Sequence, residues 1–294
     1  MKLRLVLNKE CPLNCVYCYK EGIFSDRKNL LNYKDLNFII KEARKSGFDE
    51  IKFTGGEPTL YKNLFSLIET SNKEGYLEKR MTTNGLALGN FDYCKSLKKS
   101  GLDGVTVSVN SFNKEIYEKM VGKGRDTYKK MMQGLNNAIK VFGSTVILNT
   151  VLTKYNFSDI PNLVEFAKEK GLGVKILDML DEEKKASSIY VSLSKIKKAM
   201  GWKNPSYKNA IEEIFKFNDA HISLRNSCCG RKECDICREG YHVVRITTDG
   251  KLKTCIAKED SKDEKNAFDI IKKRDSVKLR KVLSNLAKKF IIPE

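Results

Sequence analysis

The sequence predicts an α/β fold built around a parallel sheet, and three observations lead to that prediction. Short apolar runs typical of strands alternate with amphipathic segments typical of helices over the first 180 residues. Six such strand–helix units follow one another, and parallel strands joined in this way need right-handed crossovers. The polar motifs of this part lie at or just after the ends of strands, where open α/β sheets place their sites.

The individual elements are assigned from local periodicity. The predicted strands span residues 3–7, 50–53, 79–83, 104–109, 145–151 and 174–177. The predicted helices between them carry apolar residues at i, i+3 and i+4 and span residues 36–43, 60–71, 91–97, 128–141 and 160–168.

The remainder of the chain changes character. Residues 181–223 are mixed and charged, and we expect them to be helical, with a break at Asn204-Pro205. Residues 241–247 and 251–256 flank Asp249-Gly250 and predict a β-hairpin, and residues 262–286 predict a basic helix. We therefore expect three regions, at 1–180, 181–224 and 225–294.

Composition limits the classes of function. The formal net charge of +18 raises the expectation of a polyanionic partner, but the lysines are spread along all predicted helices, with no dense basic block. Nucleic acid is therefore not the expected partner, whereas a phosphorylated small substrate fits the same charge. Nine cysteines, mostly at metal-ligand spacing, indicate a reducing compartment. No signal peptide and no apolar run of ~18 residues occurs, so we expect a cytoplasmic protein without a membrane partner.

The first cysteine cluster consists of Cys11, Cys15 and Cys18, at the spacing C-x3-C-x2-C, on the loop that leaves the first predicted strand. Three thiolates on a short loop can hold three irons of a 4Fe–4S cube and leave the fourth iron open. A structural zinc loop is the alternative, but zinc favours cysteine pairs and four ligands.

This spacing resembles that of the radical S-adenosylmethionine (radical SAM) enzymes. The resemblance extends to the segments at 54–58, 82–85 and 107–110, which read TGGEP, TTNG and VSVN. It implies a partial (β/α)6 barrel, open on one side, with a small C-terminal iron–sulfur appendage. It also implies reductive cleavage of S-adenosylmethionine to a 5′-deoxyadenosyl radical that abstracts hydrogen. Such an enzyme needs anaerobic handling and a reducing partner such as flavodoxin or ferredoxin.

The resemblance also assigns residues to S-adenosylmethionine. Two glycines let the backbone approach a ligand that a Cβ would block, and Glu57 offers a carboxylate to the methionine ammonium group. The aromatic residue before the last cysteine would lie against the adenine, although a core tyrosine remains an equal alternative. The assigned residues are Tyr17, Gly55, Gly56, Glu57, Ser108 and Leu180.

A second cysteine cluster lies near the C-terminus. Cys234, Cys237 and Cys255, the last carried back by the predicted hairpin, indicate an auxiliary 4Fe–4S cluster, with zinc as the main alternative. Residues 245–255 resemble the C-terminal motif of the GTP 3′,8-cyclases of molybdenum-cofactor synthesis, in which three cysteines hold an auxiliary cluster whose open iron contacts the substrate base.

Two departures accompany this match. The gap between Cys237 and Cys255 holds 17 residues, longer than expected in the cyclases, and Cys228 and Cys229 have no counterpart there. Either extra thiol would close the cluster, as in the twitch or SPASM appendages of peptide- and carbohydrate-modifying relatives. An unligated, simply buried pair is the alternative.

The candidate substrate residues are mixed as well. Arg4, Lys52 and Arg245 match basic residues with which the cyclases hold triphosphate, and guanidinium groups suit phosphate well. Thr83, at the end of the third predicted strand, is a further candidate contact.

Other positions differ from the cyclases. Val243 replaces an arginine, Ile147 stands where a lysine is expected, and the sequence closes on residues 291–294 without the cyclases' Gly-Gly tail. We therefore expect a phosphorylated or nucleotide-like substrate and a reaction other than the strict cyclisation.

Two alternatives stay open. The first is a radical SAM maturase that modifies peptides, suggested by the extra cysteines, with a structural or electron-transfer auxiliary cluster. The second is an iron–sulfur or zinc protein that binds nucleic acid, which charge alone favours and which leaves Gly55, Gly56 and Glu57 without a purpose.

Overall fold

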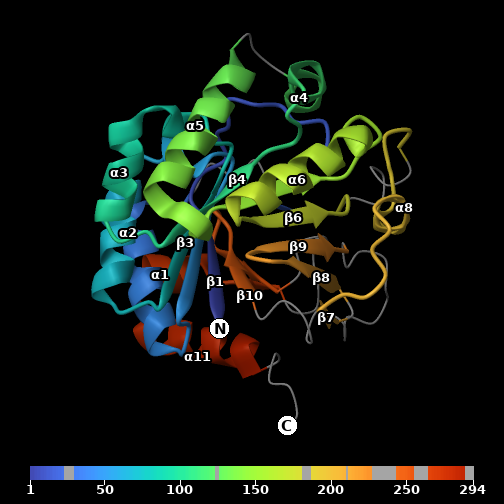
Figure 1. Cartoon of the computed structure of the whole chain (residues 1–294). Coiled ribbons are helices and arrows are strands. Elements are labelled where there is room, and N and C mark those ends of the chain that lie inside the picture. Colours follow the sequence, from blue (N-terminus) through green and yellow to red (C-terminus); the bar gives the residue numbers. More distant parts are fainter. Residues whose placement is uncertain are drawn as a thin grey trace.

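One open sheet organises the molecule (Figure 1). The computed structural model describes residues 1–22, 30–122, 126–180, 187–209, 211–226, 243–254 and 264–288. Within these ranges twelve strands pair in the order β12-β11-β10-β1-β2-β3-β4-β5-β6-β9-β8-β7. The strands from β10 to β9 run parallel, and the pairs beyond them at both edges are antiparallel.

The first six strands are those that the apolar runs predict, and the sheet extends beyond them on both sides. The strands are β1 (Lys2–Val6), β2 (Glu50–Thr54), β3 (Glu78–Thr83), β4 (Gly104–Ser108), β5 (Ile147–Val151), β6 (Gly173–Leu177), β7 (Tyr207–Lys208), β8 (Glu212–Phe217), β9 (Ala220–Arg225), β10 (Val243–Ile246), β11 (Lys251–Lys253) and β12 (Lys265–Asn266).

Helices flank the parallel strands, as the alternating pattern predicts (Figure 1). They are α1 (Tyr33–Lys45), α2 (Leu64–Lys73), α3 (Phe91–Lys99), α4 (Lys114–Val121), α5 (Thr127–Phe142), α6 (Ile160–Lys170), α8 (Leu193–Ala199), α10 (Phe268–Lys272) and α11 (Ser276–Lys288). Helix α4, which is short and lies close to α5 along the chain, is not among the predicted helices.

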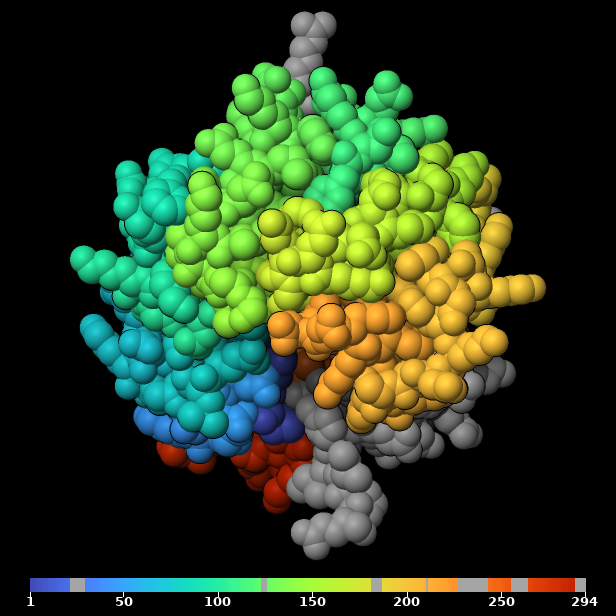
Figure 2. All heavy atoms as spheres, in the orientation of Figure 1, coloured from blue at the N-terminus to red at the C-terminus, as the bar shows by residue number. Residues whose placement is uncertain are grey.

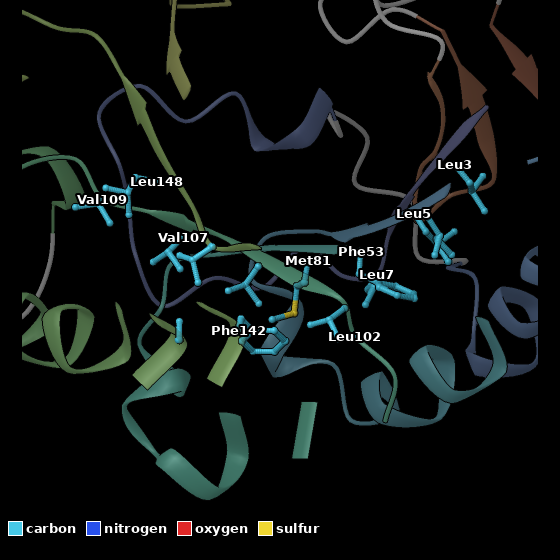
Figure 3. Packing of buried hydrophobic residues seen from close by; sticks show 14 of the residues in the cluster. Leu3, Leu5, Leu7, Phe53, Met81, Leu102, Val107, Val109, Phe142 and Leu148 are labelled. Atoms are coloured by element: carbon cyan, nitrogen blue, oxygen red, sulfur yellow. The ribbon is translucent and has the colours of Figure 1, made fainter. Parts of the chain in front are cut away.

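The hydrophobic core lies on one face of the strands. Side chains alternate between the two faces of a strand, so Leu3 and Leu5 of β1 point to one side together with Phe53 of β2 and Met81 of β3. Figure 3 shows these side chains packed in one layer with Val107 and Leu148. All six are fully buried, so the opposite face of the sheet is left for polar groups.

The segment after β6 corrects one prediction. Residues 181–223 were expected to be helical, but in the described part of this stretch, residues 187–209 and 211–223, only α8 is an α-helix, and β7, β8 and β9 form an antiparallel hairpin system that joins the sheet at β6. Apolar and polar residues alternate in β9 and over residues 215–217 of β8, and Asn218 takes the positive φ of a tight turn. The β-pattern therefore prevails over the charged composition.

The C-terminal region returns to the start of the chain. The predicted hairpin is confirmed where it is described, because β10 and β11 pair antiparallel around Asp249 and Gly250. Beyond the prediction, β10 also pairs parallel with β1, so the hairpin continues the main sheet. Figure 1 shows α11 (red) beside α1, near the N-terminus. None of the helices in the described ranges is long and apolar enough to span a membrane.

Candidate functional site

The loop after β1 carries the first cysteine cluster. Its backbone is held by the end of α4, because the Asn14 and Val16 amides donate to the carbonyls of Val121 and Met120, both at 2.9 Å. Cys11 and Cys18 are exposed and Cys15 is half-buried. Burial, together with the neighbouring Cys18 and Cys11 thiols, raises the pKa of Cys15 to about 12.

The three thiols lie within electrostatic reach of one another. Even so, no group of three His, Cys, Asp or Glu side chains in the described ranges is gathered closely enough to hold a metal ion. The residue types fit an iron–sulfur cluster, because soft thiolates are the ligands that such clusters take. The raised pKa values fit as well, since bound iron would supply the positive charge that these thiolates lack here.

Gly55 and Gly56 let the cysteine loop dock on the end of β2. A Cβ on Gly55 would lie 2.3 Å from Asn8 Oδ1, and one on Gly56 would lie 2.2 Å from the Glu10 carbonyl oxygen. The Gly56 amide donates to the Asn8 carbonyl at 2.9 Å, and the Glu57 amide donates to the Glu10 carbonyl at 2.7 Å. These glycines therefore permit an approach between two stretches of backbone.

Glu57 ties the ends of β2 and β3 together. Its Oε1 accepts hydrogen bonds from the Thr83 hydroxyl at 2.7 Å and from the amide and hydroxyl of Thr59, while Oε2 accepts from the Asn84 amide at 2.7 Å. Burial raises the pKa of this carboxyl group, and the hydrogen bonds from Asn84, Thr83 and Thr59 oppose that rise. Among the described residues Oε2 accepts one hydrogen bond, which leaves it capacity for another donor.

The other residues assigned to S-adenosylmethionine lie at the same edge of the sheet. The Tyr17 hydroxyl donates to Asn110 Oδ1 at 2.7 Å, which links the cysteine loop to the loop after β4. Ser108 is the last residue of β4, and Leu180 lies three residues past the end of β6; both are half-buried. The topology thus gathers these positions at the carboxyl ends of the strands, as the sequence predicts.

A row of basic residues crosses the face of the sheet opposite the core. In the strand register Arg4 is the partner of both Arg245 and Lys52, and Lys52 is the partner of Arg80. Lys175 of β6 lies on the same face. Arg4, Lys52, Lys175 and Arg245 each stand between two apolar residues of their strands, and Arg80 stands next to Met81, so alternation directs these side chains away from the core.

The electrostatics show that these cations face one another. Burial holds the pKa of Lys52 well below its ordinary value, and the Lys175 and Arg4 charges lower it further. Lys52 and Lys175 stand four strands apart in the sheet, so the sheet must curve for one to act on the other. Burial likewise lowers the pKa of Lys175 to about 8. In the described part of the chain neither ammonium group forms an ion pair. Figure 2 shows β1 (dark blue) at the floor of a recess bordered by β8 and β9 (orange).

Arg4 and Arg245 are arranged differently, because Glu21 lies between them. Its Oε1 is 2.5 Å from Arg4 Nη2 and its Oε2 is 3.5 Å from Arg245 Nη2. Burial raises the pKa of Glu21, but the two guanidinium charges outweigh burial and hold that pKa below its usual value.

The second cluster lies outside the described residues. This applies to Cys228, Cys229, Cys234, Cys237 and Cys255, and no geometry is assigned to them. The pairing of β10 with β1 nevertheless shows that the hairpin preceding Cys255 lies against the strand that leads into Cys11.

Several residues of the site were missed in the sequence. Glu21 has no recognisable signal, since it follows the cysteines in an irregular segment. Lys175 and Arg80 could have been found from their pattern. Each stands next to an apolar residue that points into the core (Val174 and Ile176, and Met81), as Lys52 does between Ile51 and Phe53.

Comparison with known proteins places this geometry in a family. A family model described as "Radical SAM superfamily" matches residues 5–167, more than half of the chain. A protein named "Probable GTP 3',8-cyclase" from Sulfurisphaera tokodaii is 30% identical, over 92% of this chain and 85% of its own length. A protein named "GTP 3',8-cyclase" from Nautilia profundicola is also 30% identical, over 98% of this chain and 91% of its own.

Solved structures share the fold at low identity. Streptococcus suis SuiB bound to S-adenosylmethionine superposes with a TM-score of 0.66 at 19% identity, covering 91% of this chain and 63% of SuiB. The chain thus spans less than two thirds of the length of SuiB. Native anSMEcpe with bound AdoMet gives 0.64 at 18% identity, covering 99% of this chain and 82% of the other.

Proposed function

Because the chain belongs to the radical SAM superfamily, we propose that it cleaves S-adenosylmethionine reductively and uses the resulting radical on a small phosphorylated, nucleotide-like substrate. Cys11, Cys15 and Cys18 would hold the 4Fe–4S cluster. When bound, that cluster supplies the electron that splits the sulfonium and releases a 5′-deoxyadenosyl radical. The chain's own residues would bind and orient S-adenosylmethionine and the substrate and shield the radical from solvent.

The loops at the carboxyl edge of the sheet would perform the orienting. Glu57 is held by Thr83 and Asn84 on one side and leaves capacity on Oε2, which suits an ammonium donor such as that of methionine. Tyr17 is fixed through Asn110, so the aromatic ring beside Cys18 has a defined orientation. Ser108 and Leu180 complete the proposed S-adenosylmethionine site at this edge of the sheet.

The observation that carries the substrate class is the pair of ammonium groups of Lys52 and Lys175. A desolvated cation without a carboxylate partner is costly, and an anionic ligand removes that cost. Phosphate groups provide such a ligand, and the relatives named GTP 3',8-cyclase support a nucleotide-like molecule. Those names do not favour the peptide-modifying alternative.

The reaction is proposed to differ from strict GTP cyclisation. Val243 on β10 and Ile147 on β5 are apolar where basic residues are expected in the cyclases. An auxiliary 4Fe–4S cluster at Cys234, Cys237 and Cys255 belongs to the same proposal, with Cys228 or Cys229 as a closing ligand. The reducing partner would be a flavodoxin or ferredoxin.

Anaerobic reconstitution tests the proposal directly. Reduced protein with S-adenosylmethionine should release 5′-deoxyadenosine and methionine, and Cys15→Ala should abolish this release. The matched control is Cys94→Ala, since Cys94 is buried in α3 away from the cysteine loop. We expect about eight irons per chain, falling to about four in a Cys234→Ala/Cys237→Ala variant.

Two results would count against the proposal. Loaded, reduced protein that leaves S-adenosylmethionine intact would remove the radical chemistry. Formation of a pterin precursor from GTP would restore the strict cyclase reaction and make the substitutions at Val243 and Ile147 irrelevant.

A further inference from the structure

The arginine pair next to the cysteine loop already holds an anionic group, and that group is part of the chain. Glu21 Oε1 lies 2.5 Å from Arg4 Nη2 and accepts a hydrogen bond from the Thr54 hydroxyl at 2.8 Å. Its other oxygen lies 3.5 Å from Arg245 Nη2. The Arg4 side chain also donates to the Tyr19 hydroxyl at 3.3 Å.

The Glu21 carboxylate only partly satisfies the Arg245 guanidinium group. The Arg245 side chain is 3% exposed, and its Nε and Nη2 make no hydrogen bond within the described residues. Its Nη1 donates to the Glu21 carbonyl oxygen at 3.4 Å, and its guanidinium carbon lies 5.9 Å from the centre of the Tyr19 ring. A carboxylate has two oxygens in one plane, whereas a phosphate group presents three around a tetrahedral centre. The unsatisfied donors therefore match a larger anion better than Glu21.

The backbone that brings Glu21 to this position is strained. Lys20 and Glu21 have φ values of 50° and 54°, in the left-handed region that non-glycine residues rarely adopt. Strain of this kind persists only where the surroundings enforce it. Here the enforcing contacts are those of the Glu21 carboxylate with Arg4, Thr54 and Arg245. A ligand that replaces the carboxylate would release the strain.

We propose that Glu21 is an internal stand-in for an anionic group of the substrate, and that binding of the substrate's phosphate displaces it from Arg4 and Arg245. This inference rests on the proposed function, because it takes the substrate to be phosphorylated. Lys52 and Lys175 form no ion pair in the described part of the chain and can attract the anion. Only a ligand with enough negative charge to compete with the Glu21 carboxylate then reaches Arg4 and Arg245. A ligand with a single carboxylate gains nothing by the exchange, whereas a polyphosphate does.

Glu21 also lies three residues after Cys18, so its displacement would move the segment that leaves the cysteine loop. Substrate binding would thereby shift the backbone that follows the cluster ligand Cys18. If Glu21 instead only holds the arginines in place, its removal would leave them disordered and anion binding would weaken. The two roles thus predict opposite changes in affinity.

Calorimetric titration of the reconstituted protein with tripolyphosphate separates these roles. Glu21→Gln should bind tripolyphosphate at least about tenfold more tightly than the unmodified chain, because the competing charge is gone. The matched control is Glu213→Gln, which also removes one negative charge. Glu213 lies on β8, and its carboxylate pairs with Lys197 and Lys208. Its affinity should equal that of the unmodified chain.

A second pair of variants locates the effect. Arg4→Met in the Glu21→Gln background should cancel the gain, which places the anion at the arginine pair. Glu21→Asp keeps the charge but shortens the side chain, so it should give a smaller gain even if Glu21→Gln fails to fold.

The outcomes test the displacement of Glu21 separately from the phosphorylated substrate. Equal or weaker binding by Glu21→Gln, with the unmodified chain still binding tripolyphosphate, would overturn the role of Glu21 alone. Absence of binding by both proteins would overturn the phosphorylated substrate as well.

Discussion

Lys52 and Lys175 illustrate how single residues define the interior of this sheet. Both stand at strand positions whose neighbours point into the core, so alternation alone sends them to the opposite face. There burial lowers the pKa of both, and the Lys175 charge adds to the lowering of the pKa of Lys52. Glu50, an acidic residue near the start of β2, pairs with Lys2 at 2.6 Å and not with either of these lysines. The two lysines are therefore a local excess of positive charge.

The pKa of Lys175 gives a pH-dependent prediction. Because burial lowers this pKa to about 8, the ammonium form that attracts anions is lost as pH rises through 8. Affinity for sulfate, which keeps its charge throughout this range, should fall by about tenfold for each pH unit above 8. Calorimetry between pH 6.5 and 9.5 checks this.

Lys175→Arg is the diagnostic variant, because a guanidinium group stays charged across the range and should preserve more of the affinity at pH 9. Lys95→Arg, on the exposed surface of α3, serves as the control. Parallel pH profiles for Lys175→Arg and the unmodified chain would contradict the assignment.

At the scale of elements, the cysteine loop depends on the end of β2. The loop is bound by backbone hydrogen bonds to Gly56 and Glu57 on one side and to the end of α4 on the other. These contacts are possible only because Gly55 and Gly56 have no side chain. A Cβ at either position would collide with backbone carbonyl oxygens that cannot rotate away. The glycines thus act on the cluster ligands through the loop.

Gly56→Ala should therefore damage both stability and cluster binding. The added Cβ would lie 2.2 Å from the Glu10 carbonyl oxygen and 2.4 Å from that of Lys9, so the loop must shift. We expect the free energy of unfolding to fall by about 2–3 kcal/mol and iron retention to drop. Urea unfolding and iron analysis measure the two effects.

Gly89→Ala provides the comparison. Its Cβ would meet the nearest atom, the Lys130 carbonyl oxygen, at 3.6 Å, which is an ordinary contact. If Gly56→Ala proves as stable and as rich in iron as Gly89→Ala, the docking role of Gly56 is wrong.

At the scale of the whole molecule, the C-terminal segment fastens onto the beginning of the chain. Strand β10 extends the sheet at β1, and the Leu31 amide donates to the Thr248 carbonyl at 2.8 Å. The Asp35 carboxylate, 2% exposed, caps the start of α1 and pairs with Lys272 at 2.5 Å and with Arg274 at 3.0 Å. The arginine pair of Arg4 and Arg245 exists only because of this closure.

Asp35→Asn should loosen this closure. The variant keeps the size of the side chain but removes the charge that holds Lys272 and Arg274, so the free energy of unfolding should fall by about 1–2 kcal/mol. The partners are about one third exposed, and solvent screening keeps the effect at this modest size. Urea unfolding gives the measurement.

The control is Asp92→Asn, whose carboxylate is 85% exposed and pairs with Lys95 within α3. Its midpoint should stay unchanged. Combination with Lys272→Met should be non-additive, and full additivity of the two substitutions would show that Asp35 acts on α1 alone.

Much of this arrangement follows from local sequence. The strands β1 to β6 are predictable because each is a short apolar run between polar turns, and the motif residues follow them at once. Residues 207–209 and 211–223 were assigned wrongly because their charged composition hid an alternation that becomes decisive only when β9 pairs with β6. Likewise α4 is too short to be recognised without the loop that it anchors.

The sequence by itself determined the α/β class, the placement of Cys11, Cys15 and Cys18 after the first strand, and the glycines that follow the second. Local periodicity and turn chemistry suffice for these, because they act between residues close along the chain. Only the tertiary structure decided that Lys52 faces Lys175 and that Glu21 lies between Arg4 and Arg245. Those contacts depend on the curvature of the sheet and on closure of the chain over 224 residues, from Glu21 to Arg245, which no local pattern encodes.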